Sequence, residues 1–182
     1  MKTEKPTTKI IAGKYKGKIL ELPSLDVTRS SKARLKESLF NVLQFDIIDK
    51  IFIESFAGSG SIGLEAISRG AKRAYFVELD RNSYQILLKN CKAVDMEKCQ
   101  TVQGNTFVQT PLFINFLKNS QDEIVLYIDP PFDYRDGMED IYEKSFTMIK
   151  NIEVDNIYMI IVEHVSSLEM PEILGKFSLN KT

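Results

Sequence analysis

The chain has 182 residues, of which 43% are hydrophobic, so it can form one compact domain with a small appendage. It holds no apolar run of the ~18 residues that cross a bilayer and no signal peptide, so we expect a cytoplasmic protein without membrane attachment. Cys91, Cys99 and the single histidine, His164, are too few for a structural zinc site. We therefore expect free thiols, no metal, a structural His164 and a monomer.

The net charge of −1 is unevenly distributed. Residues 1–37 carry ten Lys and Arg against four Asp and Glu, a net charge of +6, and residues 38–182 carry −7. A basic segment on an acidic body indicates an anionic polymer such as RNA, because phosphates are neutralised locally. The residues expected to contact RNA are Lys14, Tyr15, Lys16, Arg29 and Arg34, with Lys36 contributing to the positive charge. The alternative is a solvated, frayed N-terminus.

The predicted elements begin with a hairpin over residues 10–22 and a helix over residues 33–44, capped by Ser30 or Ser31. Strands are then predicted at 51–55, 74–79, 99–103, 124–128 and 157–162, alternating with helices near 61–69, 82–93, 108–118 and 138–150. This alternation predicts an α/β fold with a doubly wound, mostly parallel sheet. We divide the chain into a basic extension, residues 1–45, and a ligand-binding domain, residues 46–182.

A glycine-rich loop follows the first strand of the predicted sheet, with Gly58, Gly60 and Gly63 spaced as in dinucleotide-binding proteins. Glu78 ends the next strand about 20 residues later, where an acid binds ribose hydroxyls. Tight packing alone also explains such glycines. Glu54 before the loop would repel a pyrophosphate but suits the cationic groups of S-adenosylmethionine. Asn105, after the third strand, is placed to bond the adenine amine.

The sequence Asp129-Pro130-Pro131-Phe132 follows the apolar run 124–128. Two prolines cannot continue a central strand, so these residues lie beyond its carboxyl end, where open α/β sheets bind ligands. The Asp129 carboxylate and the Pro130 carbonyl can accept the two hydrogens of a planar amine while Phe132 stacks on its ring. A turn with a core phenylalanine is the alternative.

With five motifs in order, residues 9–165 resemble a class I, Rossmann-like S-adenosylmethionine-dependent methyltransferase of the RsmD family, which methylates guanine N2 in 16S ribosomal RNA. The motifs are Ile10–Gly17, Thr28–Asn41, Phe56–Ala66, Val77–Arg81 and Asp129–Phe132. The resemblance implies that Glu78 binds ribose and Leu79 lies against adenine. It also implies that Asp129 and Pro130 hold the target amine. The remaining cofactor residues expected are Glu54, Phe56, Gly58, Ser59, Gly60, Asn105 and Thr106.

The chain departs from the family pattern in several places. Ser30 stands where a proline is usual, Ala33 where an aspartate is usual, and Glu54-Ser55 where the first strand usually ends in Asp. The family also continues into a final β-hairpin, which we expect to be shortened or missing here.

The expected activity is methylation of a guanine N2 amine in 16S ribosomal RNA, on an assembling small subunit. The alternative substrates are adenine N6 or cytosine N4, in DNA or other RNA. Two other classes remain open: an NAD(P)-dependent oxidoreductase, and an RNA-binding module without catalysis.

Overall fold

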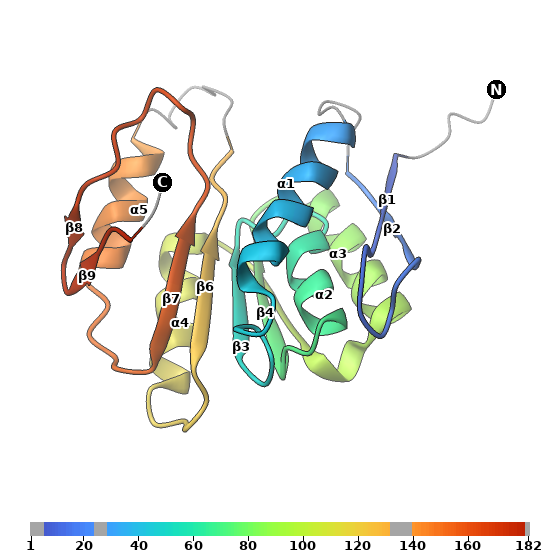
Figure 1. Ribbon diagram of the computed structural model, residues 1–182, viewed down its shortest axis with the longest axis horizontal. Coiled ribbons are helices and arrows are strands. Elements are labelled where there is room, and N and C mark those ends of the chain that lie inside the picture. The colour runs from blue at the N-terminus through green and yellow to red at the C-terminus, as the bar shows by residue number, and fades with distance from the viewer. Residues whose placement is uncertain (1–5, 24–28, 132–139, 181–182) are drawn as a thin grey trace.

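The computed structural model describes residues 6–23, 29–131 and 140–180 (Figure 1). The amino-terminal elements are β1 (Thr7–Lys9), β2 (Ile19–Glu21) and α1 (Arg29–Leu43). The next are β3 (Ile51–Ser55), α2 (Ser61–Ser68), β4 (Arg73–Glu78), α3 (Arg81–Val94), the 3₁₀ turn η1 (Met96–Lys98) and β5 (Cys99–Gln103). The last are α4 (Thr106–Leu117), β6 (Ile124–Ile128), α5 (Ile141–Lys150), β7 (Ile157–Val162), β8 (Ile173–Leu174) and β9 (Phe177–Ser178).

The central sheet has five parallel strands in the order β5-β4-β3-β6-β7. Its two faces bury different side chains, because successive residues of a strand point to opposite sides. Phe52, Phe76 and Tyr127 pack with α1, α2 and α3, whereas Ile53 and Leu126 pack with α4 and α5. The two layers of helices are visible in Figure 1. The predicted doubly wound α/β fold is therefore confirmed.

The predicted sheet strands agree with the observed ones to within one residue. The cap prediction for the first helix is wrong: α1 begins at Arg29, so Ser30 and Ser31 lie inside its first turn. The amino-terminal hairpin is present, but its first strand is Thr7–Lys9, and residues 10–18 form the connection. A short antiparallel hairpin, β8 and β9, lies near the end of the chain and forms a two-stranded sheet apart from the central one. Within the described ranges, no helix is long and apolar enough to span a bilayer.

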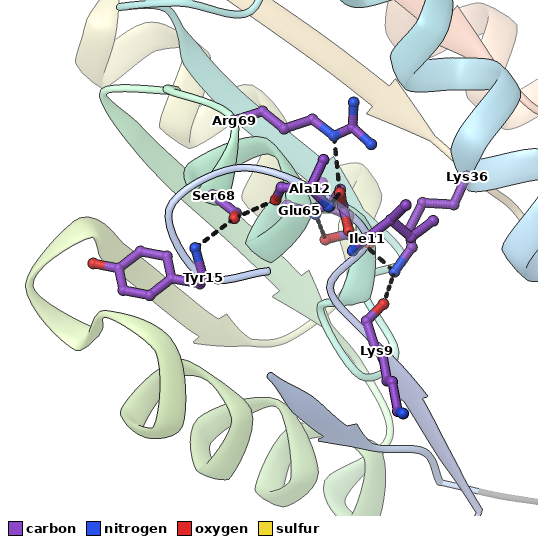
Figure 2. A network of polar contacts seen from close by, with 10 residues as sticks. Lys9, Ile11, Ala12, Tyr15, Lys36, Glu65, Ser68 and Arg69 are labelled. Carbon is purple, nitrogen blue, oxygen red and sulfur yellow. Dashed lines mark hydrogen bonds and ion pairs between the residues drawn. The ribbon is translucent and has the colours of Figure 1, made fainter. Parts of the chain in front are cut away.

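Glu65, fully buried in the middle of α2, holds the hairpin connection against the domain (Figure 2). Its carboxylate accepts the backbone N–H groups of Ile11 and Ala12 at 2.8 and 3.0 Å and pairs with the Arg69 guanidinium at 2.8 Å. The Lys36 ammonium lies 3.3 Å from the same carboxylate and donates to the Lys9 carbonyl at 2.7 Å. One acidic side chain thus joins α1, α2 and the hairpin.

The burial of Lys36 corrects the charge analysis. Its side chain is 3% exposed, so its positive charge faces Glu65 and is not available to RNA phosphates. Burial lowers the pKa of Lys36, and the neighbouring Glu65 carboxylate opposes that shift.

We expect Glu65→Ala to unfold at least 6 °C below the wild type, because losing one member of a buried ion pair costs about 3–5 kcal/mol. The control is Glu123→Ala, which removes the partner of Lys50 from an exposed ion pair and should cost less than about 1 kcal/mol. Thermal unfolding followed by circular dichroism measures both. Equal melting temperatures for the two variants would contradict a stabilising role for Glu65.

Candidate active site

An open cleft of about 2200 Å³ lies at the carboxyl ends of the parallel strands. Glu54, Glu78 and Asp129 line it, from the ends of β3, β4 and β6. Strand order reverses between β3 and β6, and this is where open α/β sheets bind their ligands. A pocket for a drug-sized ligand measures about 300–1,000 Å³, so this cleft has room for a cofactor and a second group.

The glycine loop joins β3 to α2 and forms part of the cleft wall. Gly58 has a φ of +55°, and a Cβ there would meet no atom within 4 Å, so this backbone is open to a ligand. Gly60 faces the core instead: a Cβ there would lie 2.4 Å from the Leu87 Cδ1. A Cβ on Gly63 would lie 2.4 Å from the Phe76 ring, so Gly63 allows α2 to pack on the sheet. Two of the three glycines therefore serve packing.

Glu78 lies beside this loop and its carboxylate is already oriented by backbone groups. Gly58 N–H donates to Oε2 at 2.6 Å and Asp80 N–H donates to Oε1 at 2.7 Å. Burial raises the pKa of Glu78, while these hydrogen bonds oppose the shift. A carboxylate has about four acceptor sites, so it can still receive ribose hydroxyls. Leu79, 60% exposed, adds an apolar surface to the cleft next to it.

Asn105, Thr106 and Phe56 form the next part of the wall. Asn105 caps α4, since its side chain accepts the Phe107 N–H at 2.8 Å. The buried Thr106 hydroxyl accepts the Phe56 N–H at 3.3 Å. Phe56 has a φ of +62°, a strained conformation for a residue with a bulky side chain, and such strain concentrates at binding sites. Ser59 also lines the cleft, and its carbonyl accepts the Asn90 amide at 2.9 Å.

Glu54 is 3% exposed and accepts the Gly63 N–H at 2.8 Å. Burial raises the pKa of Glu54 to about 8, and repulsion from Asp129 and Glu78 adds to this. A cation bound nearby would favour the ionised form. The acidic groups at this edge of the sheet therefore suit a positively charged ligand.

Asp129 and Pro130 line the cleft beyond β6, whereas Phe132 lies outside the described residues. Sequence reasoning missed two cleft residues close to them, Tyr127 and Glu163. The buried Tyr127 hydroxyl donates to the Glu163 carboxylate. Tyr127 lies two residues before Asp129, and Glu163 follows β7 as Asp129 follows β6, which is a signal that the sequence contains.

The predicted RNA-binding residues lie in two places. Lys14, Tyr15 and Lys16 belong to the hairpin connection, where Lys14 N–H bonds to Ser68 at the end of α2 opposite the glycine loop. Lys14 and Lys16 are exposed, but the Tyr15 hydroxyl donates to Asp95 at 2.6 Å and its ring packs against the core. Arg34 is exposed on α1, next to the cleft residues Leu35 and Lys36. The Arg29 side chain lies outside what the structure describes.

His164 and the cysteines take no part in the polar contacts of the cleft described above. His164 Nδ1 lies 3.0 Å from the Val165 carbonyl oxygen, and Cys91 and Cys99 are buried free thiols. Across residues 6–23, 29–131 and 140–180, no group of three or more His, Cys, Asp and Glu side chains is arranged to hold a metal ion.

The chain is similar to known proteins in both sequence and fold. Residues 8–182 match the family described as Conserved hypothetical protein 95. Ribosomal RNA small subunit methyltransferase D of Escherichia coli K12 is 30% identical over 175 residues, which are 95% of this chain and 82% of that protein. The Haemophilus influenzae protein of the same name is 38% identical over 133 residues, which are 71% of this chain and 66% of that protein.

A solved structure shows the same fold. That of yhhF from Escherichia coli, described as a methyltransferase, is 31% identical with a TM-score of 0.65 and covers 91% of this chain and 86% of that one.

We expect the stability of the protein to fall as the pH rises from 5 to 8, because Glu54 binds a proton more tightly when folded. Between pH 4.5 and about 8 the unfolded chain has lost the Glu54 proton while the folded protein keeps it, so stability falls across this range and levels off once folded Glu54 ionises. In this range Glu54 lowers the free energy of unfolding by about 1.4 kcal/mol for each unit by which the pH rises. Glu54→Gln keeps an acceptor for Gly63 and cannot ionise, so urea unfolding should show a flatter profile. Parallel profiles for the two proteins would refute the pKa shift.

Proposed function

Because this chain belongs to the RsmD-like family of ribosomal RNA methyltransferases, we propose that it methylates the N2 amine of a guanine in 16S ribosomal RNA, with S-adenosylmethionine as donor. The observation that carries this proposal is the position of Asp129 and Pro130 in the same cleft as Glu78 and the glycine loop. The substrate is the RNA of an assembling small subunit.

The residues present fit S-adenosylmethionine better than a dinucleotide. Glu78 would hold the ribose, with Leu79, Asn105 and Thr106 around the adenine. Glu54, together with Gly58 and the adjoining loop residues Phe56 and Ser59, would surround the methionine end, whereas Gly60 faces Leu87 and does not line the cleft. The buried Glu54 carboxyl, with a pKa raised to about 8 beside Asp129 and Glu78, favours a cationic ligand over a pyrophosphate. This argues against an NAD(P)-dependent oxidoreductase.

S-adenosylmethionine, when bound, supplies a methyl group whose bond to the sulfonium breaks as the amine nitrogen forms the new N–C bond. The Asp129 carboxylate and the Pro130 carbonyl accept the two hydrogens of the amine, whose lone pair is otherwise delocalised into the ring. This favours a pyramidal nitrogen with its lone pair directed at the donor. The methylated nitrogen then loses its proton to water or to Asp129, so no histidine base is required. Phe132 would stack on the extruded base.

We expect Asp129→Ala to lower methylation at least a hundredfold, because it removes an acceptor that orients the reacting amine. The assay supplies labelled S-adenosylmethionine with ribosomal RNA, small subunits and duplex DNA, and identifies the methylated nucleoside after digestion. Asp155→Ala, at a fully exposed side chain, is the control and should keep wild-type activity.

Three results of this assay decide between the candidates. N2-methylguanosine in RNA supports the proposal, and N6-methyladenine in DNA at a comparable rate refutes the guanine assignment. An RNA-binding module without catalysis would incorporate no methyl group, and Asp129→Ala would change nothing.

RNA would dock on the basic amino-terminal segment, at Arg29 and Arg34 of α1 and at Lys14, Tyr15 and Lys16 of the hairpin connection. The two exposed lysines lie at the far end of α2, so only an RNA that extends along this face reaches both places. The acidic body directs the phosphates to this segment.

We expect Arg34→Gln, and separately the double variant Lys14→Gln/Lys16→Gln, to bind small-subunit RNA less tightly with a flatter dependence on salt. Each lost phosphate contact lowers the log–log slope by about 0.7–0.9. Lys118→Gln, at an exposed lysine just past the end of α4, is the matched control. Fluorescence anisotropy at several salt concentrations measures the slopes. Slopes equal to that of the control in both variants would remove this segment from the RNA interface.

A further inference from the structure

We propose that Glu163, held by Tyr127, accepts the N1–H of the target base and thereby selects guanine over bases whose ring nitrogen is an acceptor. This rests on the proposed function and assigns a residue to its choice of base. Glu163 would be a specificity-determining residue, and Tyr127 a positioning residue that acts through it.

The register of β6 and β7 places Glu163 beside Asp129. Ile128 pairs with Val162 in the parallel ladder, and the Glu163 N–H donates to the Ile128 carbonyl at 2.9 Å. Asp129 and Glu163 are therefore the next residues on neighbouring strands, which lie about 4.8 Å apart. Both residues line the cleft.

Tyr127 fixes the direction of the Glu163 side chain. Residues two apart on a strand point to the same face, so Tyr127 and Asp129 share a face, and the bond from the Tyr127 hydroxyl brings Glu163 to it. The Tyr127 ring is 1% exposed and stacks on Phe52 with centroids 6.0 Å apart. Burial, with the nearby Asp129 and Glu163 carboxylates, raises the pKa of Tyr127, so its hydroxyl remains a donor.

Two neighbouring carboxylates match the hydrogen-bonding edge of guanine. Guanine presents the N2 amine next to the N1–H, so two adjacent donors face two adjacent acceptors. In adenine and cytosine, the ring nitrogen beside the exocyclic amine on this edge is itself an acceptor, and a carboxylate would repel it. A carboxylate has about four acceptor sites, so Glu163 can accept the Tyr127 hydroxyl and also a donor of the base. The row of Asp129 and Glu163 therefore favours guanine among the bases with an exocyclic amine.

The test uses a small-subunit RNA oligonucleotide that contains the unmethylated target guanine. A second oligonucleotide has the same sequence but carries 2-aminopurine at the target position. 2-Aminopurine keeps the target amine but has an unprotonated ring nitrogen in place of N1–H. The wild type should prefer guanine by about tenfold to a hundredfold in kcat/KM, the range for a hydrogen bond to a charged group. Glu163→Gln can turn its amide N–H₂ toward the 2-aminopurine nitrogen, so this preference should fall at least tenfold.

Tyr127→Phe provides the second variant, since it keeps the carboxylate and removes its support. It should lower the preference for guanine about threefold, while affinity for S-adenosylhomocysteine, measured by calorimetry, stays at the wild-type value. Glu123→Gln, at an exposed side chain, is the control and should keep the wild-type preference. If Glu163→Gln methylates neither oligonucleotide, the ratio of kcat/KM for guanine to that for 2-aminopurine in Tyr127→Phe decides whether Glu163 selects guanine.

The outcomes separate this inference from the proposed function. If the wild type forms N2-methylguanosine and both variants keep its preference for guanine, the role of Glu163 is refuted and the proposed function stands. A wild type that methylates no guanine overturns both proposals. A reduced preference in either variant with retained cofactor affinity supports Glu163, because a merely structural defect would lower both substrates equally.

Discussion

The parallel pairing of β3 with β6, where the strand order reverses, is the constraint on which the cleft depends. Glu54 pairs with Tyr127 in this ladder, and Ser55 pairs with Ile128. The glycine loop and Asp129 therefore leave the sheet at the same height and face one cleft, although 70 residues separate them. The neighbouring strands β4 and β7 bring Glu78 to one side of the cleft and Glu163 to the other. The row of acidic side chains along one cleft thus follows from the order of the strands.

This arrangement places several acidic side chains in a partly buried cleft. The free-energy cost of ionising them there limits which ligands can bind. Glu54 receives one strong hydrogen bond from Gly63, yet burial and the neighbouring carboxylates still raise its pKa to about 8. A ligand that brings positive charge relieves this cost, and one that brings phosphates increases it. The same argument applies at Asp129 and Glu163, since two neighbouring carboxylates favour hydrogen-bond donors opposite them. The electrostatics of the cleft thus favour ligands that carry positive charge or hydrogen-bond donors.

Much of this fold is readable from the sequence, because the central strands are continuous apolar runs bounded by turn residues. The glycine loop, Glu78 and Asp129 were found because each follows such a run. Local patterns could not show that Lys36 is buried, since its partner Glu65 lies 29 residues away and becomes adjacent only when α1 packs on α2. Glu163 was missed because its place beside Asp129 comes from the register of β7 with β6. The strands β8 and β9 were missed because strands of two residues have no periodicity.

The basic extension differs from the rest of the chain in composition, but it packs on the same core as the helices beside the glycine loop. Ile10 and Leu20 belong to the same core as Leu64 and Phe76. Asn90 of α3 donates to the carbonyls of Glu21 and Ser59, each at 2.9 Å, and so links the hairpin to the glycine loop directly. Because Glu65 holds the other end of the hairpin, the extension is fixed to both helices that flank this loop. The position of the extension is therefore set by the same helices that hold the glycine loop.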